Sequence, residues 1–125
     1  MRKYGAIALV ALGLLFPINK AIADNIKIDK TYHAKVSWYS YGSKTANGEK
    51  FNPNHLTVAH KTIPFGTIIR FTNIETRQTI IARVNDRGPY IKGREFDVSR
   101  RCAEYLGIKV NGVQKMKIEI FRKSL

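Results

Sequence analysis

The sequence predicts a mainly β protein, a small closed barrel with one short helix. Five or six segments are rich in β-branched and aromatic residues or alternate between apolar and polar positions, and one further segment has the features of a helix. With an N-terminal export signal set aside, 102 residues remain, which suits a single domain. An open sheet of that length would expose two strand edges, and closure into a barrel removes them.

Residues 1–23 form the predicted export signal. Two basic residues follow the initiator methionine, an uncharged apolar run spans residues 4–18, and the small-residue triplet at 21–23 places the cleavage before Asp24. The alternative is an uncleaved membrane anchor, but the apolar run is shorter than the ~20 residues that a spanning helix needs. We therefore expect a periplasmic or secreted protein with no permanent membrane anchor after cleavage.

The charge of the chain favours an anionic partner. Cleavage would lower the net charge from +13 to +10, because three of the 22 basic residues and none of the 9 acidic residues lie in the signal. Such a charge attracts cell-wall polymers, lipopolysaccharide or anionic lipids, although it also serves solubility alone. A nucleic-acid partner would rest on charge only, and the export signal argues against it. We expect no nucleic-acid partner and a monomeric chain.

The first half of the domain holds one strand, a long loop and a short apolar segment. Residues 24–31 are polar and predict a flexible leader, after which the barrel domain spans residues 32–125. The segment 32–39 (YHAKVSWY) has the composition of a strand. Residues 40–55 are rich in glycine, asparagine and serine and predict a long loop, and such loops often carry function. Residues 56–59 form the short apolar segment.

A hairpin is predicted in the middle of the domain. The β-rich runs 66–74 and 78–84 are separated by the polar residues 75–77, a length that suits a hairpin turn. A second loop with two glycines and a proline follows at residues 85–93. Residues 95–98 then predict a short strand.

The C-terminal part predicts one helix and one strand. Ser99 is a favoured helix N-cap and Gly107 a favoured helix end, so the helix is expected over residues 100–106. Residues 113–121 alternate, with apolar side chains at 116, 118 and 120 on one face and lysines together with Glu119 on the other. That pattern indicates a half-buried final strand.

Four polar residues are candidates for chemistry. Glu49 follows an Asn-Gly turn, His60 follows an apolar segment, Asp86 stands where an apolar run ends, and Asp97 has apolar neighbours. Each also has a common structural interpretation: a solvated loop acid, a satisfied histidine, a turn cap and a hydrogen-bonded acid. The histidines are dispersed, so we predict no metal site and no other cofactor. Cys102 is the only cysteine, and we expect a buried thiol.

Several sequence motifs occur together along the predicted domain: SWYS at 37–40, TANGE at 45–49, LTVAHKTIPFGT at 56–67, RVNDRGPY at 83–90 and KGREFDVS at 92–99. Together they resemble the rare lipoprotein A (RlpA) family of septal-ring lytic transglycosylases. The resemblance covers nearly the whole domain, and the combination of AHKT and PFGT with NDRGP is specific.

The resemblance implies a fold, a substrate and a set of site residues. The fold is a six-stranded double-psi β-barrel, and the substrate is the glycan strand of peptidoglycan, preferably without stem peptides. The family's acidic and histidine site residues fall on Glu49, His60 and Asp86. Asp97 matches the acid of related double-psi barrels such as membrane-bound lytic transglycosylase A and the expansins. Many family members are lipoproteins, whereas no lipid-acceptor cysteine stands at the expected cleavage site.

The implied reaction needs few catalytic groups. A lytic transglycosylase breaks the β-1,4 bond between N-acetylmuramic acid and N-acetylglucosamine, and the 6-hydroxyl of the muramic acid attacks to leave a 1,6-anhydro end. One carboxyl group can act as both acid and base, because the nucleophile belongs to the substrate. Asp86 is the first candidate for this role and Asp97 the second.

The remaining candidates are assigned supporting roles. Glu49 would orient the substrate or tune proton affinity, and His60 would bind a carboxylate or the N-acetyl group. Trp38 is expected in the core. The alternative function is that of an expansin-like protein, which binds and loosens wall polysaccharide without cleaving it. The expected sugar contacts are Tyr39, Asn47, Arg87 and Tyr90.

Overall fold

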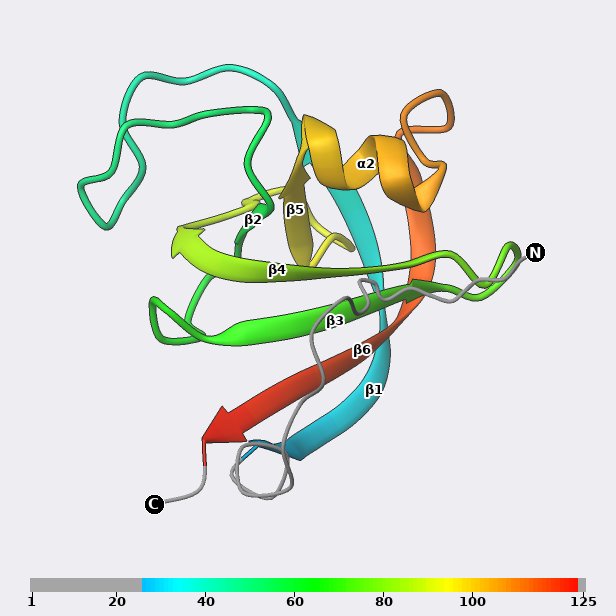
Figure 1. The fold of residues 1–125 in the computed structure, drawn as a ribbon. Helices are drawn as coiled ribbons and strands as arrows, with labels where there is room; N and C mark the ends of the chain where they lie inside the picture. Colours follow the sequence, from blue (N-terminus) through cyan, green and yellow to red (C-terminus); the bar gives the residue numbers. More distant parts are fainter. Residues whose placement is uncertain (1–25, 124–125) are drawn as a thin grey trace, which may run out of the picture. The chain divides into compact units, whose positions relative to one another are not determined.

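Six strands close into a barrel in the computed structural model, which describes residues 26–123 (Figure 1). Neighbouring strands follow the order β1-β5-β2-β4-β3-β6, and the barrel lies within the compact unit Ile28–Arg122. The mainly β, six-stranded fold with one short helix in the described part is confirmed. The predicted export signal lies outside the described residues. The elements are β1 (Ile26–Tyr39), β2 (Thr57–Ala59), β3 (Ile68–Asn73), β4 (Thr79–Asp86), β5 (Phe96–Ser99), α2 (Arg100–Leu106) and β6 (Val113–Lys123).

The barrel combines parallel and antiparallel pairs. β1 runs parallel to β5, and β2 runs parallel to β4, whereas β2 and β5 are antiparallel. β3 is antiparallel to both β4 and β6. Only β3 and β4 are both consecutive in the chain and paired. The other pairings therefore join segments that are far apart in the sequence.

The first strand is longer than the sequence analysis predicted. β1 begins at Ile26 rather than at Tyr32, so residues 26–31 extend the strand instead of forming a flexible leader. The apolar residues Ile26 and Ile28 alternate with polar ones, which is a strand pattern that the prediction overlooked. Asp29, in this extension, contacts β6: its carboxylate oxygen lies 3.6 Å from Nε of Arg122.

Apolar side chains from all six strands fill the barrel interior. The rings of Phe71 and Phe96 meet edge to face, with centroids 5.2 Å apart. Trp38 is half-buried and packs against this core, as predicted. Within residues 26–123 no helix is long and apolar enough to span a membrane. The fully buried apolar strand residues are Val36, Val58, Ile69, Phe71, Val84, Phe96, Val98, Met116 and Ile118.

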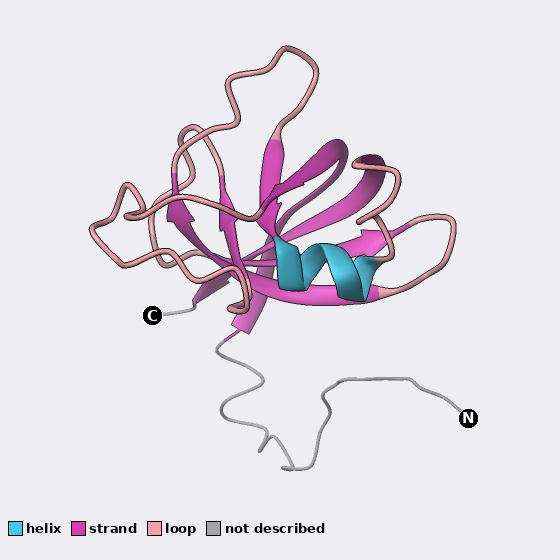
Figure 2. Cartoon of the chain, turned by 90° about the horizontal axis from the view of Figure 1, so that it is seen from above, coloured by secondary structure: helices cyan, strands magenta, loops and turns pink. Residues whose placement is uncertain are grey.

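The helix α2 forms where the sequence predicted it. The Ser99 side chain accepts a hydrogen bond from the Cys102 amide, and Gly107 ends the helix in the left-handed conformation with φ of 73°. Cys102 and Leu106 turn toward the strands and are fully buried, which confirms the buried thiol. Viewed from above, the helix lies across one flank of the barrel while the long loops project elsewhere (Figure 2).

One acid of the final strand is less exposed than its sequence pattern suggested. Glu119 stands on the outer face of β6 with the lysines, yet only 5% of its surface is exposed. Arg70 lies opposite it in the β3–β6 register and donates two hydrogen bonds of 2.8 and 2.9 Å to its carboxylate. These bonds lower the pKa of Glu119. The cross-strand ion pair therefore covers a position that alternation alone would assign to solvent.

Asn73 connects the β3–β4 hairpin to the end of α2. Its side-chain amide donates a 2.8 Å hydrogen bond to the carbonyl of Leu106, and its side-chain oxygen accepts one of 3.0 Å from the Glu75 amide. Asn73 is 3% exposed, so a change there leaves polar backbone groups without a partner inside the protein.

Replacing Asn73 tests this connection. The variant Asn73→Ala is expected to lower the free energy of unfolding by about 1–3 kcal/mol, because it leaves the Leu106 carbonyl unpaired. Urea unfolding followed by circular dichroism measures the change. Glu75→Ala is the matched control on the same turn, since Glu75 is exposed, and it should change stability by less than about 0.5 kcal/mol. Equal stability of the two variants would show that the Asn73 hydrogen bonds do not stabilise the fold.

Candidate active site

Asp86, at the end of β4, receives hydrogen bonds from three separate segments. Tyr39 of β1 donates its hydroxyl to one carboxylate oxygen at 2.9 Å. The backbone amides of Ala46 and Arg87 donate to the other oxygen, each at 2.9 Å. Both oxygens of this carboxyl group therefore act as hydrogen-bond acceptors. The predicted site residues Asp86 and Tyr39 are therefore in direct contact.

Tyr39 is held in place by stacking as well as by this hydrogen bond. Its ring stacks on Phe51, with centroids 4.6 Å apart and an angle of 18° between the planes. Burial and the negative charge of Asp86 raise the pKa of the Tyr39 hydroxyl. The hydroxyl consequently keeps its proton and remains a donor to Asp86.

Asp97 lies on the other side of β2 from Asp86. Ala59 pairs with Asp97 of β5 and, past a register shift after Val58, with Asp86 of β4. Ser37 and Tyr39 alternate along β1 and contact Asp97 and Asp86, which places the two acids on the same side of the sheet. Two strand spacings put the Cα atoms of the two aspartates about 10 Å apart. Ala59, which stands between the two acids, is buried.

The surroundings of Asp97 differ from those of Asp86. Burial raises the pKa of the Asp97 carboxyl group, and the negative charge of Asp86 adds to the rise. A 2.9 Å hydrogen bond from the Ser37 hydroxyl and the positive charge of Arg94 oppose it without cancelling it. The net effect of these surroundings is to raise the pKa of Asp97 above its ordinary value.

Glu49 is held as a carboxylate by its neighbours. Arg83 of β4 donates two hydrogen bonds to it, at 2.7 and 2.9 Å, and Asn47 and Asn85 donate one each, at 2.9 and 3.1 Å. These bonds lower the pKa of Glu49 from its ordinary value of 4.5 to about 2. Through its hydrogen bonds with Arg83 and Asn85, Glu49 connects the long loop to β4.

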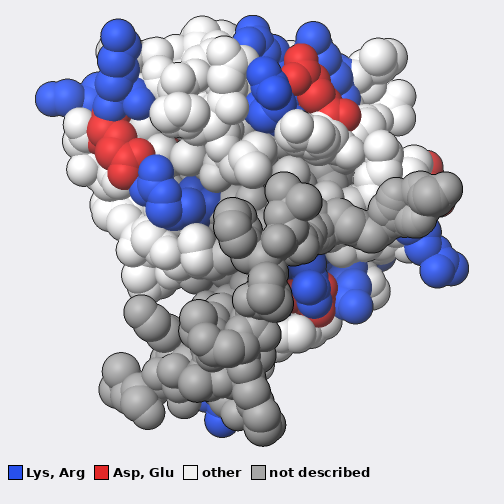
Figure 3. Space-filling view, in the orientation of Figure 1, with Lys and Arg blue, Asp and Glu red and all other residues white. Residues whose placement is uncertain are grey.

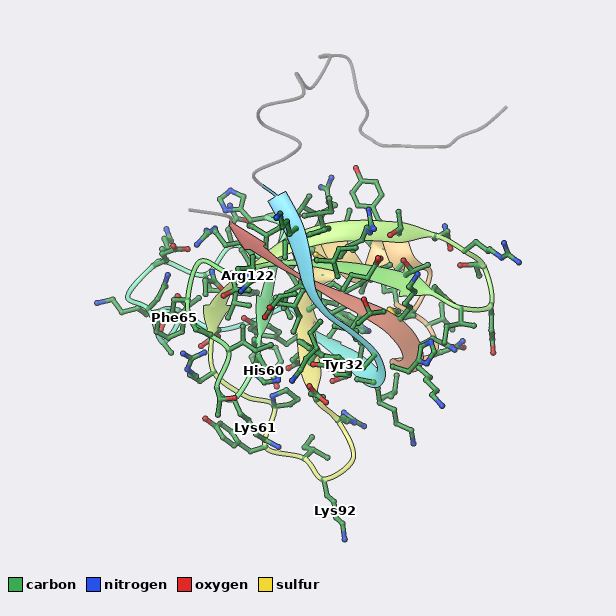
Figure 4. All side chains as sticks on the ribbon, turned by 90° about the horizontal axis from the view of Figure 1, so that it is seen from below. Tyr32, His60, Lys61, Phe65, Lys92 and Arg122 are labelled. Carbon is green, nitrogen blue, oxygen red and sulfur yellow. The ribbon has the colours of Figure 1, made fainter. Side chains whose placement is uncertain are left out.

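His60 belongs to a second cluster. Its Nδ1 atom accepts hydrogen bonds from the amides of Thr62 and Ile63, at 3.0 and 3.1 Å. The ring proton must therefore sit on Nε2, which lies 3.1 Å from the Glu95 carboxylate. Glu95 also accepts a 2.5 Å hydrogen bond from Tyr32, and Figure 4 shows Tyr32 and His60 near each other at the same end of the barrel.

The His60 ring makes no hydrogen bond or ion pair with Glu49, Asp86 or Asp97 within the described part of the chain. Its link to Asp86 runs through the backbone, because the His60 amide donates to the Asp86 carbonyl at 3.2 Å. Both ring nitrogens are occupied, and the residue is 9% exposed. The backbone of His60 thus contacts Asp86, whereas its ring contacts Glu95 and Phe96.

The four expected sugar contacts occupy different positions. Tyr39 holds Asp86, as described. The Arg87 guanidinium donates to the carbonyls of His60 and Ile63, at 3.2 and 2.8 Å, and lies over the ring of Phe65 at 3.9 Å. The Asn47 side chain bonds within its own loop, to Thr45 and Glu49. Tyr90 is 76% exposed, so its ring is open to solvent.

Four residues that the sequence analysis did not single out take part in these clusters. Ser37 contacts Asp97, Arg83 and Asn85 contact Glu49, and Glu95 contacts His60. Ser37 could have been found from the sequence, because it lies two residues before Tyr39 on the same strand and therefore on the same face. The partners on β4 and β5 depend on strand register, for which the sequence held no comparable signal. Among residues 26–123 no group of three or more potential ligands is placed to hold a metal ion.

Comparison with known sequences gives a consistent family. Residues 31–118 match the family described as "Lytic transglycolase". A Synechocystis protein named probable endolytic peptidoglycan transglycosylase RlpA is 46% identical over 88 residues, which are 68% of this chain and 27% of that protein. The Rickettsia felis protein named endolytic peptidoglycan transglycosylase RlpA is 47% identical over 90 residues, 67% of this chain and 40% of that protein. The chain thus spans well under half the length of these curated relatives.

Comparison with solved structures supports the fold. The Streptomyces papain inhibitor superposes with a TM-score of 0.64 at 19% identity, covering 76% of this chain and 97% of the inhibitor. The apo form of an expansin from Clavibacter michiganensis superposes with a TM-score of 0.62 at 18% identity, covering 77% of this chain and 52% of the expansin. At these identities the likeness concerns the barrel alone.

The low pKa of Glu49 leads to a pH-dependent stability prediction. A carboxyl group with a lowered pKa stabilises the fold above its ordinary pKa, and the contribution disappears as the pH falls toward the folded value. Glu49→Gln is therefore expected to be less stable than the wild type above pH 5, with the gap closing between about 4.5 and about 2. Thermal unfolding across this pH range measures it. A gap that is independent of pH would mean that the charge of Glu49 does not matter.

Proposed function

The chain belongs to the lytic transglycolase family, and from that premise we propose that it is a peptidoglycan lytic transglycosylase. It cleaves the β-1,4 bond between N-acetylmuramic acid and N-acetylglucosamine within glycan strands and leaves a 1,6-anhydro-muramic end. The names of its relatives, which are endolytic peptidoglycan transglycosylases, support the reaction class. The observation that carries the proposal is the pair of aspartates with different surroundings on either side of Ala59.

Asp97 is the acid and base of this proposal, and Asp86 is the second acid of the site. Two carboxyl groups whose environments push their proton affinities apart are the usual basis for such an assignment. Asp97 has a raised pKa because it is partly buried, whereas the carboxyl group of Asp86 accepts hydrogen bonds from Tyr39 and two backbone amides. The sequence analysis put Asp86 first for the acid role; the hydrogen bonds favour Asp97 instead.

The reaction can then proceed with one proton donor. Asp97 gives its proton to the glycosidic oxygen as the bond from that oxygen to C1 of the muramic acid breaks. The 6-hydroxyl oxygen of the same sugar forms the new bond to C1, and its proton passes to the Asp97 carboxylate. The proton is returned and no water is consumed. Because the nucleophile is tethered in the substrate, no second catalytic carboxyl group is needed to activate water.

The negative charge of Asp86 supports the positive charge that develops on the sugar ring in such a transition state. Tyr90, four residues after Asp86, is an exposed aromatic residue and is suited to stack on a sugar ring. Glu49, Asn47, Arg87 and His60 act as positioning residues, because their polar atoms already hold the loops around the aspartates.

The substrate and the location follow from the same proposal. The substrate is the glycan strand without stem peptides, and the protein works outside the cytoplasm, in the periplasm or secreted, as a monomer. The export signal predicted for residues 1–23 and the wall-directed names of the relatives support this location.

An expansin-like function is the second candidate. The similarity of the barrel to the Clavibacter michiganensis expansin favours it, since that fold also serves a protein named as an expansin. Such a protein would bind insoluble wall material without forming products. Mass spectrometry of denuded glycan strands after incubation separates the two functions, because only the enzyme generates 1,6-anhydro ends.

Replacing Asp97 tests the catalytic assignment. Asp97→Asn keeps the size of the side chain and removes the proton, so kcat is expected to fall by about 10²–10⁴-fold. For the wild type, kcat should fall as the pH rises through the raised pKa of Asp97, because the protonated form is the reactive one. Release of 1,6-anhydro products from denuded strands is the measurement.

Ser40→Ala serves as the control, since Ser40 neighbours the site without a hydrogen bond to either aspartate in the described residues. It should leave kcat within about twofold of the wild type. Full activity of Asp97→Asn would exclude Asp97 as the acid. An absence of anhydro products from the wild type itself, with active control enzymes, would exclude the enzyme and leave the wall-binding function.

A further inference from the structure

We propose that Lys44 and Lys50 form a subsite for the free lactyl carboxylate of a muramic acid residue next to the bond that is cleaved. The proposal rests on the proposed function and names the chemical group on the glycan strand that the protein would recognise. It is carried by the unusual placement of these two lysines at the base of the hairpin that contacts Asp86.

The two lysines lie directly opposite each other in an antiparallel bridge. Hydrogen bonds from Phe51 to Ser43, at 3.1 Å, and from Thr45 to Glu49, at 2.8 Å, hold the hairpin on either side of them. Side chains at paired positions project from the same face, and like charges placed directly opposite destabilise the pair. The arrangement therefore costs stability unless an anion lies between the ammonium groups.

Both lysine side chains point away from the barrel. Their neighbours Thr45 and Phe51 are buried, and Glu49 turns toward Arg83 of β4, so alternation puts Lys44 and Lys50 on the opposite, solvent-facing side of the hairpin. Both are exposed. Figure 3 shows lysine and arginine atoms gathered around an acidic group over the part of the surface where Figure 1 draws this loop.

No acid of the described residues neutralises the pair. Neither lysine makes an ion pair with another residue between 26 and 123. The nearby acid Glu49 is fully engaged, because Arg83, Asn47 and Asn85 occupy its two oxygens. The positive charge of the lysines is thus available to a ligand.

The hairpin is close enough to the aspartates to meet the same strand of substrate. The amide of Ala46 bonds to the Asp86 carboxylate, and Lys44 is two residues away, about 7 Å along an extended chain. A glycan strand without stem peptides carries one free carboxylate on each muramic acid, whereas a stem peptide converts that carboxylate to a neutral amide. A lysine pair at this place would therefore favour the strand without peptides.

A binding measurement on two forms of one glycan tests the subsite. The ligands are peptide-free strands and the same strands after conversion of their lactyl carboxylates to methylamides. All proteins carry Asp97→Asn so that the strands are not consumed. Adding K44Q and K50Q is expected to weaken binding of the free-carboxylate strands about tenfold at low salt, with no change for the methylamide strands. The difference should shrink as the salt approaches about 0.15 M.

Two further variants keep the test specific. K44R with K50R retains the charge and should bind as tightly as the parent protein. K115Q with K117Q removes the same charge from two exposed positions of β6 and should change binding less than about twofold. Melting temperatures confirm folding, and K44Q with K50Q should melt no lower than the parent, since the lysines repel each other.

Equal affinity of the parent for the two strand forms would overturn the subsite, as would equal losses in the hairpin and β6 variants. If the parent binds neither form, the proposed function itself fails. If it binds both forms with the same affinity, the function stands and only the lysine subsite is rejected.

Discussion

The site depends on the hydrogen bonds that the Asp86 carboxylate accepts, because they join three segments that are far apart in the sequence or in the fold. Tyr39 comes from the end of β1, Ala46 from the hairpin of the long loop, and Arg87 from the turn after β4. The long loop has little regular structure, so its position relies on this carboxylate and on the Glu49–Arg83 ion pair. Asp86 thus has a structural role in this loop, and our proposal assigns the proton-donor role to Asp97.

The barrel topology gives the two aspartates different environments on a shared face. β2 separates them with a single alanine, and the strands on either side reach it in opposite directions. Asp86 accepts hydrogen bonds from two backbone amides and from Tyr39. Asp97 accepts one from the Ser37 hydroxyl and is partly buried. In the proposed reaction the substrate supplies its own nucleophile, so one carboxyl group with a raised pKa is enough as acid and base. The hairpin above Asp86 adds a positive charge that the described part of the protein leaves unpaired.

Local patterns predicted the parts of the structure that depend on neighbouring residues. The helix lies between Ser99 and Gly107 because cap preferences are local, and Asp86 was found at the end of an apolar run. The resemblance to a family, rather than residue spacing, assembled the site. Contacts such as Glu95 with His60 were not predictable, because they depend on pairing between strands that are not consecutive in the chain.

The assignment of roles to the two aspartates can be measured most directly by a carbon-13 NMR titration of the side-chain carboxyl groups. The Asp97 resonance is identified by its absence from the spectrum of Asp97→Asn. The account predicts that this carboxyl group titrates above its ordinary pKa of 3.8, because burial and the charge of Asp86 disfavour its ionised form. A midpoint at or below 3.8 would contradict it. Asp97 would then have no raised pKa, and another group would have to be the proton donor.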